Sequence, residues 1–237
     1  MKASKSFQHL CSAALWLGAA LAPGLPAYAQ SNPGYPDSVY AYDAREVAML
    51  PPYCRYTQAF RDRMPGGNNP DQIKHWESVM GATFQAMHHY CMGLMKTNRA
   101  ILIERTQQYR HFYLDSSIGE FDYVIKNAPE DFVLLPEILT KKGENLIRLG
   151  RGALGIQAFA RAIELKPDYW PPYAYMSDYY KNTGDPKKAR ELLEKALSFS
   201  PDAKGLKTRL AELDALKDKR QTAPQTRKPA SPQPPNR

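Results

Sequence analysis

Two consecutive segments in the second half of the chain, Pro136–Tyr169 and Trp170–Ala203, repeat each other with a period of 34 residues. Each has an apolar-periodic stretch, a glycine, a second apolar-periodic stretch and a closing proline. This order predicts two helices joined at a glycine turn, with the proline ending the second helix. One helix pair cannot bury its own apolar face, so such units must stack. The repeat therefore predicts an all-α fold. The matched positions are Gly143 with Ser177, Leu146 with Tyr180, Gly150 with Gly184, Gly155 with Ala189, Phe159 with Leu193, Ala162 with Ala196 and Pro167 with Pro201.

The matched positions also predict how the two helices of a unit pack. Small residues at Gly143 and Gly155, and at their counterparts Ser177 and Ala189, allow the helices to approach closely. Large residues such as Phe159 then fill the space between the helices. We therefore expect Gly143 and Ala189 to be helix-contact positions.

This pattern resembles the tetratricopeptide repeat family from Pro136 to about Pro201. The resemblance implies a superhelix of helical hairpins, here preceded by an additional helical N-terminal segment. Residues 136–203 would form two repeat units, and residues 116–135 a degenerate half-repeat with its connector. Residues 204–219 would form a capping helix, with Leu206, Leu210, Leu213 and Leu216 on one face. Four positions depart from the family pattern: Lys142 and Met176 in place of leucine, and Leu139 and Tyr173 in place of tryptophan.

The resemblance also implies a partner-binding groove made by the first helix of each unit. Its positions would be Glu137, Thr140, Glu144, Ile147 and Arg148, then Pro171, Ala174, Asp178, Lys181 and Asn182. The family's carboxylate-binding groove has basic and amide residues where this chain has Thr140, Ala174, Glu144 and Asp178. Two acids in line favour a partner segment with basic or amide groups, or they only keep this face soluble. Nearby Trp170, Tyr175 and Tyr179 form a second candidate surface, or they pack between repeats.

The first 29 residues have the pattern of a secretory signal peptide. Lys2 and Lys5 precede an apolar run from Leu10 to Ala22, and small residues precede a cleavage site after Ala29. The run is short for a membrane span, although an uncleaved anchor is the alternative. We expect an exported, periplasmic protein whose residues 30–50 form a flexible segment.

Two cysteines, Cys54 and Cys91, follow the predicted signal peptide, in an N-terminal region (51–115) that we expect to be helical. An even number of cysteines in an oxidising compartment favours a disulfide. Free buried thiols are a second interpretation. A metal site using His88, Cys91 and Met95 is a third, but the spacing lacks a repeated Cys/His pattern.

The formal net charge of +8 is concentrated at the two ends of the chain. The signal segment carries two lysines, and the segment from Lys217 to Arg237 has six basic residues and one acid. The body between them is nearly neutral, which argues against nucleic-acid binding. Residues 220–237 are rich in proline and basic residues, so we expect a disordered tail. Such a tail could contact an anionic membrane or cell-wall polymer weakly.

The chain has no sequence motif of a nucleophile elbow, a zinc protease or a phosphate-binding loop. We therefore predict a non-enzymatic scaffold or adaptor without a cofactor, which binds a protein or peptide partner. By family analogy it would serve a bacterial envelope assembly, such as polysaccharide export, pilus or secretion machinery, or cell-wall remodelling. The alternatives are a metal-binding or redox accessory protein using Cys54, Cys91 and His88, and an enzyme with a site in the N-terminal helical region.

Overall fold

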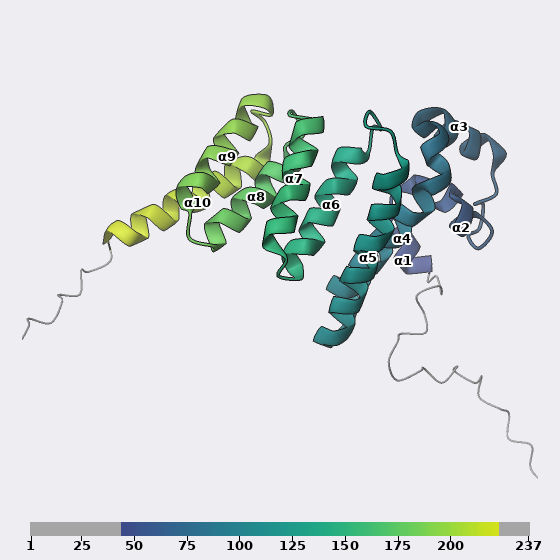
Figure 1. Cartoon of the computed structure of the whole chain (residues 1–237), viewed down its shortest axis with the longest axis horizontal. Helices are drawn as coiled ribbons and strands as arrows, with labels where there is room; N and C mark the ends of the chain where they lie inside the picture. Colours follow the sequence, from purple (N-terminus) through teal and green to yellow (C-terminus); the bar gives the residue numbers. More distant parts are fainter. Residues whose placement is uncertain (1–43, 223–237) are drawn as a thin grey trace, which may run out of the picture. The chain divides into compact units, whose positions relative to one another are not determined.

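A computed structural model describes residues 44–222, which form helices joined by turns and short connectors (Figure 1). The predicted signal peptide, most of the predicted flexible segment and most of the basic tail lie outside the described residues. Among the described helices, none has the length and apolar character needed to cross a membrane. The α-helices are α1 (Ala44–Ala48), α2 (Gln58–Arg61), α3 (Pro70–Met80), α4 (Met87–Asn98), α5 (Gln107–Asn127), α6 (Leu135–Arg148), α7 (Gly152–Leu165), α8 (Pro171–Asn182), α9 (Pro186–Phe199) and α10 (Lys204–Thr222).

The second half of the chain consists of helix pairs, as the repeat predicted. Helix α6 packs on α7 and α8 packs on α9, and each helix also contacts the next one along the chain (Figure 1). Gly150 and Gly184 end the first helix of each pair with φ values of 75° and 94°, a left-handed conformation that glycine adopts readily. Asp185 then caps α9 by accepting a hydrogen bond from the Lys188 N–H at 2.9 Å. The all-α fold of tetratricopeptide type is confirmed.

Gly143 lies at a close contact between the two helices of the first pair. A Cβ atom at this position would lie 2.4 Å from a ring carbon of Phe159, whose side chain is fully buried. On the facing helix, a Cβ atom at Gly155 would lie 2.7 Å from the Ile147 side chain. The contact therefore depends on glycine in one helix and a large ring in the other, as the repeat alignment predicted.

We expect Gly143→Ala to lower the free energy of unfolding by about 1–3 kcal/mol, because the new methyl group must displace the buried Phe159 ring. Gly119→Ala in α5 is the matched control, since a Cβ atom there meets nothing within 4 Å. That control should stabilise the chain by up to about 1 kcal/mol, the usual gain of alanine over glycine in a helix. Urea unfolding measures both changes. Equal stabilisation by the two substitutions would contradict the packing described above.

The N-terminal half is less regular than the repeats. A 3₁₀ helix, η1 (Pro52–Tyr56), and a second one, η2 (Gly81–Ala86), flank α2 and α3. Asn69 caps α3 by accepting a hydrogen bond from the Gln72 N–H at 3.1 Å. A π-helical turn, η3 (Arg99–Ile103), follows α4 directly after Asn98 and precedes α5.

Asn145 links this N-terminal half to the first repeat. Its fully buried amide donates hydrogen bonds to the hydroxyls of Thr97 (2.6 Å, α4) and Ser117 (2.8 Å, α5). Both hydroxyls in turn donate to backbone carbonyls of their own helices. The polar groups are thus satisfied, and α4, α5 and α6 are held in one arrangement.

Candidate functional site

A pocket of about 310 Å³ lies between α6, α8 and α10, and we refer to it as the groove pocket. Helix α6 supplies one side, the α7–α8 connector and α8 supply the other, and α10 contributes one arginine. Its lining residues are Glu137, Thr140, Lys141, Glu144, Tyr169, Trp170, Pro171, Ala174, Tyr175 and Arg209.

The structure gathers five of the predicted groove residues in this pocket: Glu137, Thr140, Glu144, Pro171 and Ala174. The other predicted positions lie elsewhere. Ile147 packs beside Gly155, Arg148 is exposed and pairs with Glu144, and Asn182 is exposed. Asp178 pairs with Arg209 beside the pocket, and Lys181 lines a different pocket near the end of α8.

The sequence reasoning missed Lys141 and Arg209 as groove residues, although a signal for them exists. Lys141, Tyr175 and Arg209 are separated by 34 residues each, so they occupy the same position in three successive first helices. All three line the groove pocket. Continuing the repeat period into α10 would therefore have placed Arg209 on the groove side.

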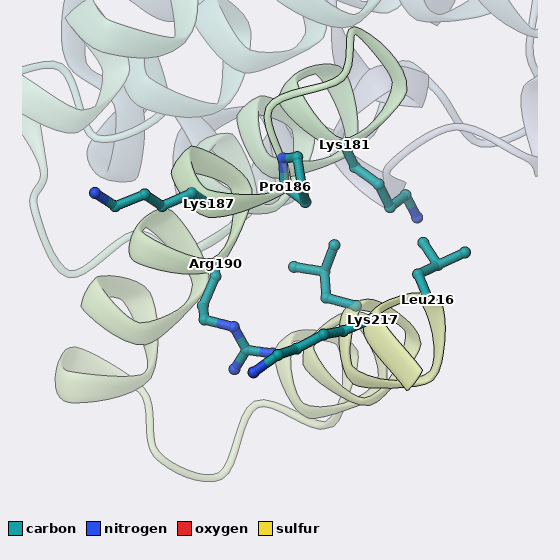
Figure 2. A pocket seen from close by; sticks show the side chains of 7 residues that line it. Lys181, Pro186, Lys187, Arg190, Leu216 and Lys217 are labelled. Carbon is teal, nitrogen blue, oxygen red and sulfur yellow. The ribbon is translucent and has the colours of Figure 1, made fainter. Parts of the chain in front are cut away.

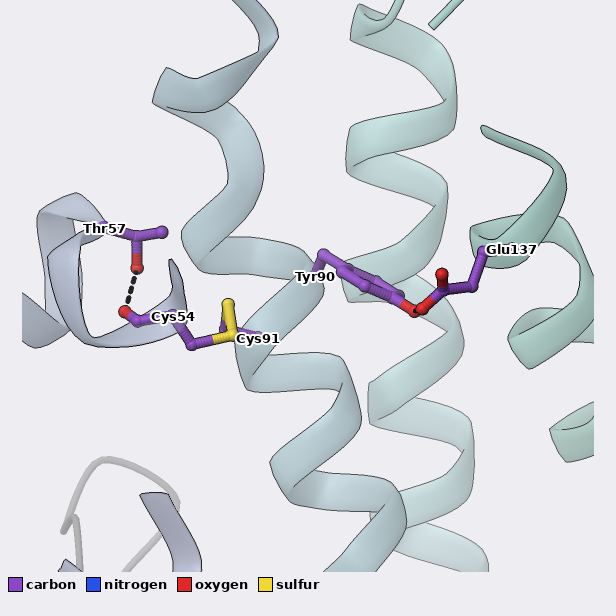
Figure 3. The surroundings of a disulfide bond; sticks show 5 residues. All are labelled: Cys54, Thr57, Tyr90, Cys91 and Glu137. Carbon is purple, nitrogen blue, oxygen red and sulfur yellow. Dashed lines mark hydrogen bonds between the residues drawn. A yellow bond between two sulfur atoms is a disulfide. The ribbon is translucent and has the colours of Figure 1, made fainter. Parts of the chain in front are cut away.

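Glu137 is held in place by the N-terminal half of the chain. The Tyr90 hydroxyl on α4 donates a 2.6 Å hydrogen bond to Glu137 Oε1 (Figure 3). Burial first, and the Glu137 carboxylate second, raise the pKa values of Tyr53, Tyr90 and Tyr169 above the ordinary value for tyrosine. These hydroxyls therefore stay protonated around the carboxylate. No lysine or arginine among the described side chains forms an ion pair with Glu137.

A disulfide is formed by the residue next to Tyr90 in the sequence. Cys91 is bonded to Cys54 of η1, and the adjacent Tyr90 points the other way, toward α6 (Figure 3). The two sulfurs therefore do not act as thiolate ligands. His88 Nδ1 lies 2.9 Å from the Gln85 carbonyl oxygen, and Met95 is fully buried. Among the described residues, no three His, Cys, Asp or Glu side chains are placed to hold a metal ion.

The two aligned acids, Glu144 and Asp178, are neutralised by cations of the chain itself. Glu144 is buried and accepts from Lys141 at 2.8 Å and from Arg148 at 3.3 Å. Burial alone would lower the pKa of Lys141, but the Glu144 carboxylate outweighs it and raises that pKa. Asp178 accepts from Arg209 at 3.0 Å.

The groove pocket therefore combines aromatic rings with one carboxylate, that of Glu137, which forms no ion pair with a described lysine or arginine. Tyr169, Trp170 and Tyr175 are each partly exposed and supply apolar faces with polar edges. Glu137 supplies an acceptor whose orientation is set by Tyr90. This arrangement can bind an apolar side chain next to a basic or amide group. It contains no nucleophile paired with a base, which acyl or phosphoryl transfer would use.

Comparison with known proteins identifies the repeat directly. Residues 173–203, which span most of α8 and α9, match the family described as Tetratricopeptide repeat. The chain is also 27% identical over 150 residues to the protein named Protein O-mannosyl-transferase TMTC1 from Homo sapiens. The aligned part is 61% of this chain and 17% of that protein, so the chain spans less than a fifth of that relative's length.

Proposed function

We propose that this chain, which is a tetratricopeptide repeat protein, acts as a scaffold that binds a segment of a partner protein in the groove pocket. Tetratricopeptide repeats are typically non-enzymatic modules for protein–protein interaction. The observation that carries the proposal is the pocket itself, built from equivalent positions of successive first helices. Five of its residues, Glu137, Thr140, Glu144, Pro171 and Ala174, are groove positions that the family resemblance implies.

The composition of the groove pocket supports a partner segment of particular chemistry. Glu137 forms no ion pair with a described lysine or arginine, since nearby Lys141 pairs with Glu144 instead. A lysine, an arginine or an amide N–H of the partner can therefore bind to it. The rings of Tyr169 and Tyr175 suit an apolar or aromatic side chain next to that group. The sequence favoured a partner with a basic or amide group because of Glu144 and Asp178. We propose that this group binds Glu137 instead.

We propose further that the protein is exported and works in a bacterial envelope assembly, such as polysaccharide export, pilus or secretion machinery, or cell-wall remodelling. The signal-peptide pattern of residues 1–29 supports export, and the Cys54–Cys91 disulfide suits an oxidising compartment. The transferase activity in the name of the human relative is not proposed here, because the chain covers only 17% of that protein.

The test is to purify the tagged full chain from its own host with its bound proteins, and to compare two double variants. Glu137→Gln with Tyr169→Ala removes the free carboxylate charge and one ring of the groove pocket. Asp131→Asn with Phe199→Ala is the matched control, since both residues are exposed and neither lines the pocket. We expect the groove variant to lose a specific co-purifying protein that the control retains.

The thermal midpoints of both variants should be measured alongside, so that a loss of binding is not caused by unfolding. Retention of the same proteins by both folded variants would overturn the groove assignment. Equal loss from both folded variants would do the same.

A further inference from the structure

A second pocket, of about 420 Å³, lies at the other end of α8, between the start of α9 and the end of the described part of α10 (Figure 2). We refer to it as the basic pocket. Pro186, Leu213 and Leu216 supply its apolar surface, and Leu216 is 41% exposed. The rest of its lining is cationic: Lys181, Lys187, Arg190 and Lys217.

Two of these four cations lack a carboxylate partner. Lys181 pairs with Glu212 at 2.9 Å, and Arg190 pairs with Asp214. No ion pair with a described side chain involves Lys187 or Lys217, which are both exposed and lie on the two sides of the pocket. The basic pocket therefore presents two unneutralised positive charges over an apolar base.

The repeat register explains why α10 is not followed by a second helix of its own among the residues that the structure describes. Gly150 and Gly184 turn the chain after the first helix of each unit, and the residue at the same position of the next unit is Asp218. Helix α10 does not turn there and continues to Thr222. In the described chain α10 packs on α8 and α9, whereas α6 and α8 are each followed by a second helix of their own.

If the repeat continued after α10, a second helix would follow it. The basic pocket lies at the place where the first turn of that helix would be. Helix α9 starts beside the end of α8, and the pocket occupies the corresponding place between the start of α9 and the end of α10. A helix seated there would place its N-terminal turn near Lys187 and Lys217. Acidic residues are favoured in the first turn of a helix by its dipole, and here they would also meet these two lysines.

We propose that the basic pocket binds an amphipathic helix of another protein, with acidic residues in its first turn and an apolar face behind them. Residues 223–237 do not match this description, because they include Arg227, Lys228 and Arg237 and no acidic residue. The apolar face of the partner helix covers Leu213 and Leu216, and its acids pair with the two lysines. This docking mode is that of a helix in a groove.

This inference extends the proposed scaffold function to a second surface, with an occupant of opposite charge character. The groove pocket offers a free carboxylate to a basic or amide group, whereas the basic pocket offers free ammonium groups to acids. The two surfaces share no lining residue. One protein could therefore bind two different segments at once.

The experiment measures binding of three fluorescent synthetic helices to the full chain by fluorescence anisotropy. The first probe has leucines at helical spacing and glutamates in its first turn. The second has lysines in place of those glutamates, and the third has the first probe's composition in a scrambled order. We expect only the first probe to bind, with an affinity that falls as the salt concentration rises.

Two double variants of equal charge change then locate the site. Lys187→Glu with Lys217→Glu should weaken binding of the first probe by about tenfold or more. Lys188→Glu with Lys207→Glu is the control, since these lysines are exposed on the same helices but do not line the pocket. The control should bind like the original chain, and Leu216→Ala should weaken binding through lost apolar contact.

Failure of the first probe to bind overturns the proposal, as does equal binding of the acidic and basic probes or an equal effect of the two double variants. The groove variant, Glu137→Gln with Tyr169→Ala, should bind the first probe normally. This separates the outcome from that of the proposed function, because loss of the groove partner leaves the basic pocket intact.

Discussion

Replacing both Cys54 and Cys91 by alanine is expected to lower the free energy of unfolding by about 4 kcal/mol. The disulfide closes a loop with a sequence separation of 37 residues, and its removal increases the conformational entropy of the unfolded chain. Both side chains are fully buried, so the variant also loses packing between η1 and α4. Urea unfolding at neutral pH measures the change, and the thermal midpoint should fall by roughly 10 °C.

A reducing agent provides the control for this prediction. Reduction should destabilise the original chain by a similar amount and leave the double alanine variant unchanged. The effect should extend to the groove pocket, because α4 also carries Tyr90, which orients Glu137. An unfolding free energy that changes by less than about 1 kcal/mol, or free thiols in the protein isolated from its host, would contradict the structural role of the disulfide.

Replacing Glu120 by alanine is the second change for which we expect a large effect, about 3–5 kcal/mol of lost stability. The Lys96 side chain is only 4% exposed, and its ammonium group donates to Glu120 Oε1 at 2.5 Å. Its other described partner is the Ser116 hydroxyl at 2.9 Å. Without Glu120, a buried positive charge has no counter-charge at this position, and His89 loses its 2.6 Å contact with the same carboxylate. Urea unfolding again gives the measurement.

Asp122→Ala on the same helix, α5, is the matched control. Asp122 also pairs with a lysine, Lys142, but its side chain is 49% exposed, so its removal should cost at most about 1 kcal/mol. Adding Lys96→Met to the Glu120 variant should restore much of the stability, because the uncompensated buried charge is then gone. If Glu120→Ala and Asp122→Ala cost the same, the pair with Lys96 is not buried in solution.

Local patterns were sufficient to predict the repeat half of the fold. Gly150 and Gly184 end the first helix of each pair, and Pro167 and Pro201 follow the second helix. These are effects of single residues on the nearby backbone. The contact of Gly143 with Phe159 was also predictable, because a 34-residue period places equivalent residues at equivalent helix contacts. The N-terminal half has no such period, so the sequence indicated a helical region there but did not specify its 3₁₀ helices, η1 and η2.

The candidate site was predicted only in part. The family resemblance implied Glu137, Thr140, Glu144, Pro171 and Ala174 as groove positions, and these five residues line the groove pocket. It did not indicate that Glu144 and Asp178 are neutralised by Lys141 and Arg209, nor that Glu137 forms no ion pair with a described lysine or arginine. Those charges depend on side-chain positions across different helices, which a pattern along one helix does not specify.

By itself the sequence determined that the chain is all-α, where the repeat helices turn, and which residues face the helix contacts, because these follow from local conformation and periodicity. The tertiary structure alone decided which charges are buried or paired, as in Lys96 with Glu120 and Asp178 with Arg209. It also decided that the leucine face predicted for the capping helix is covered at Leu206 and Leu213 but open at Leu216. The physical reason is that burial and ion pairing depend on residues distant in sequence, which only the packed chain brings together.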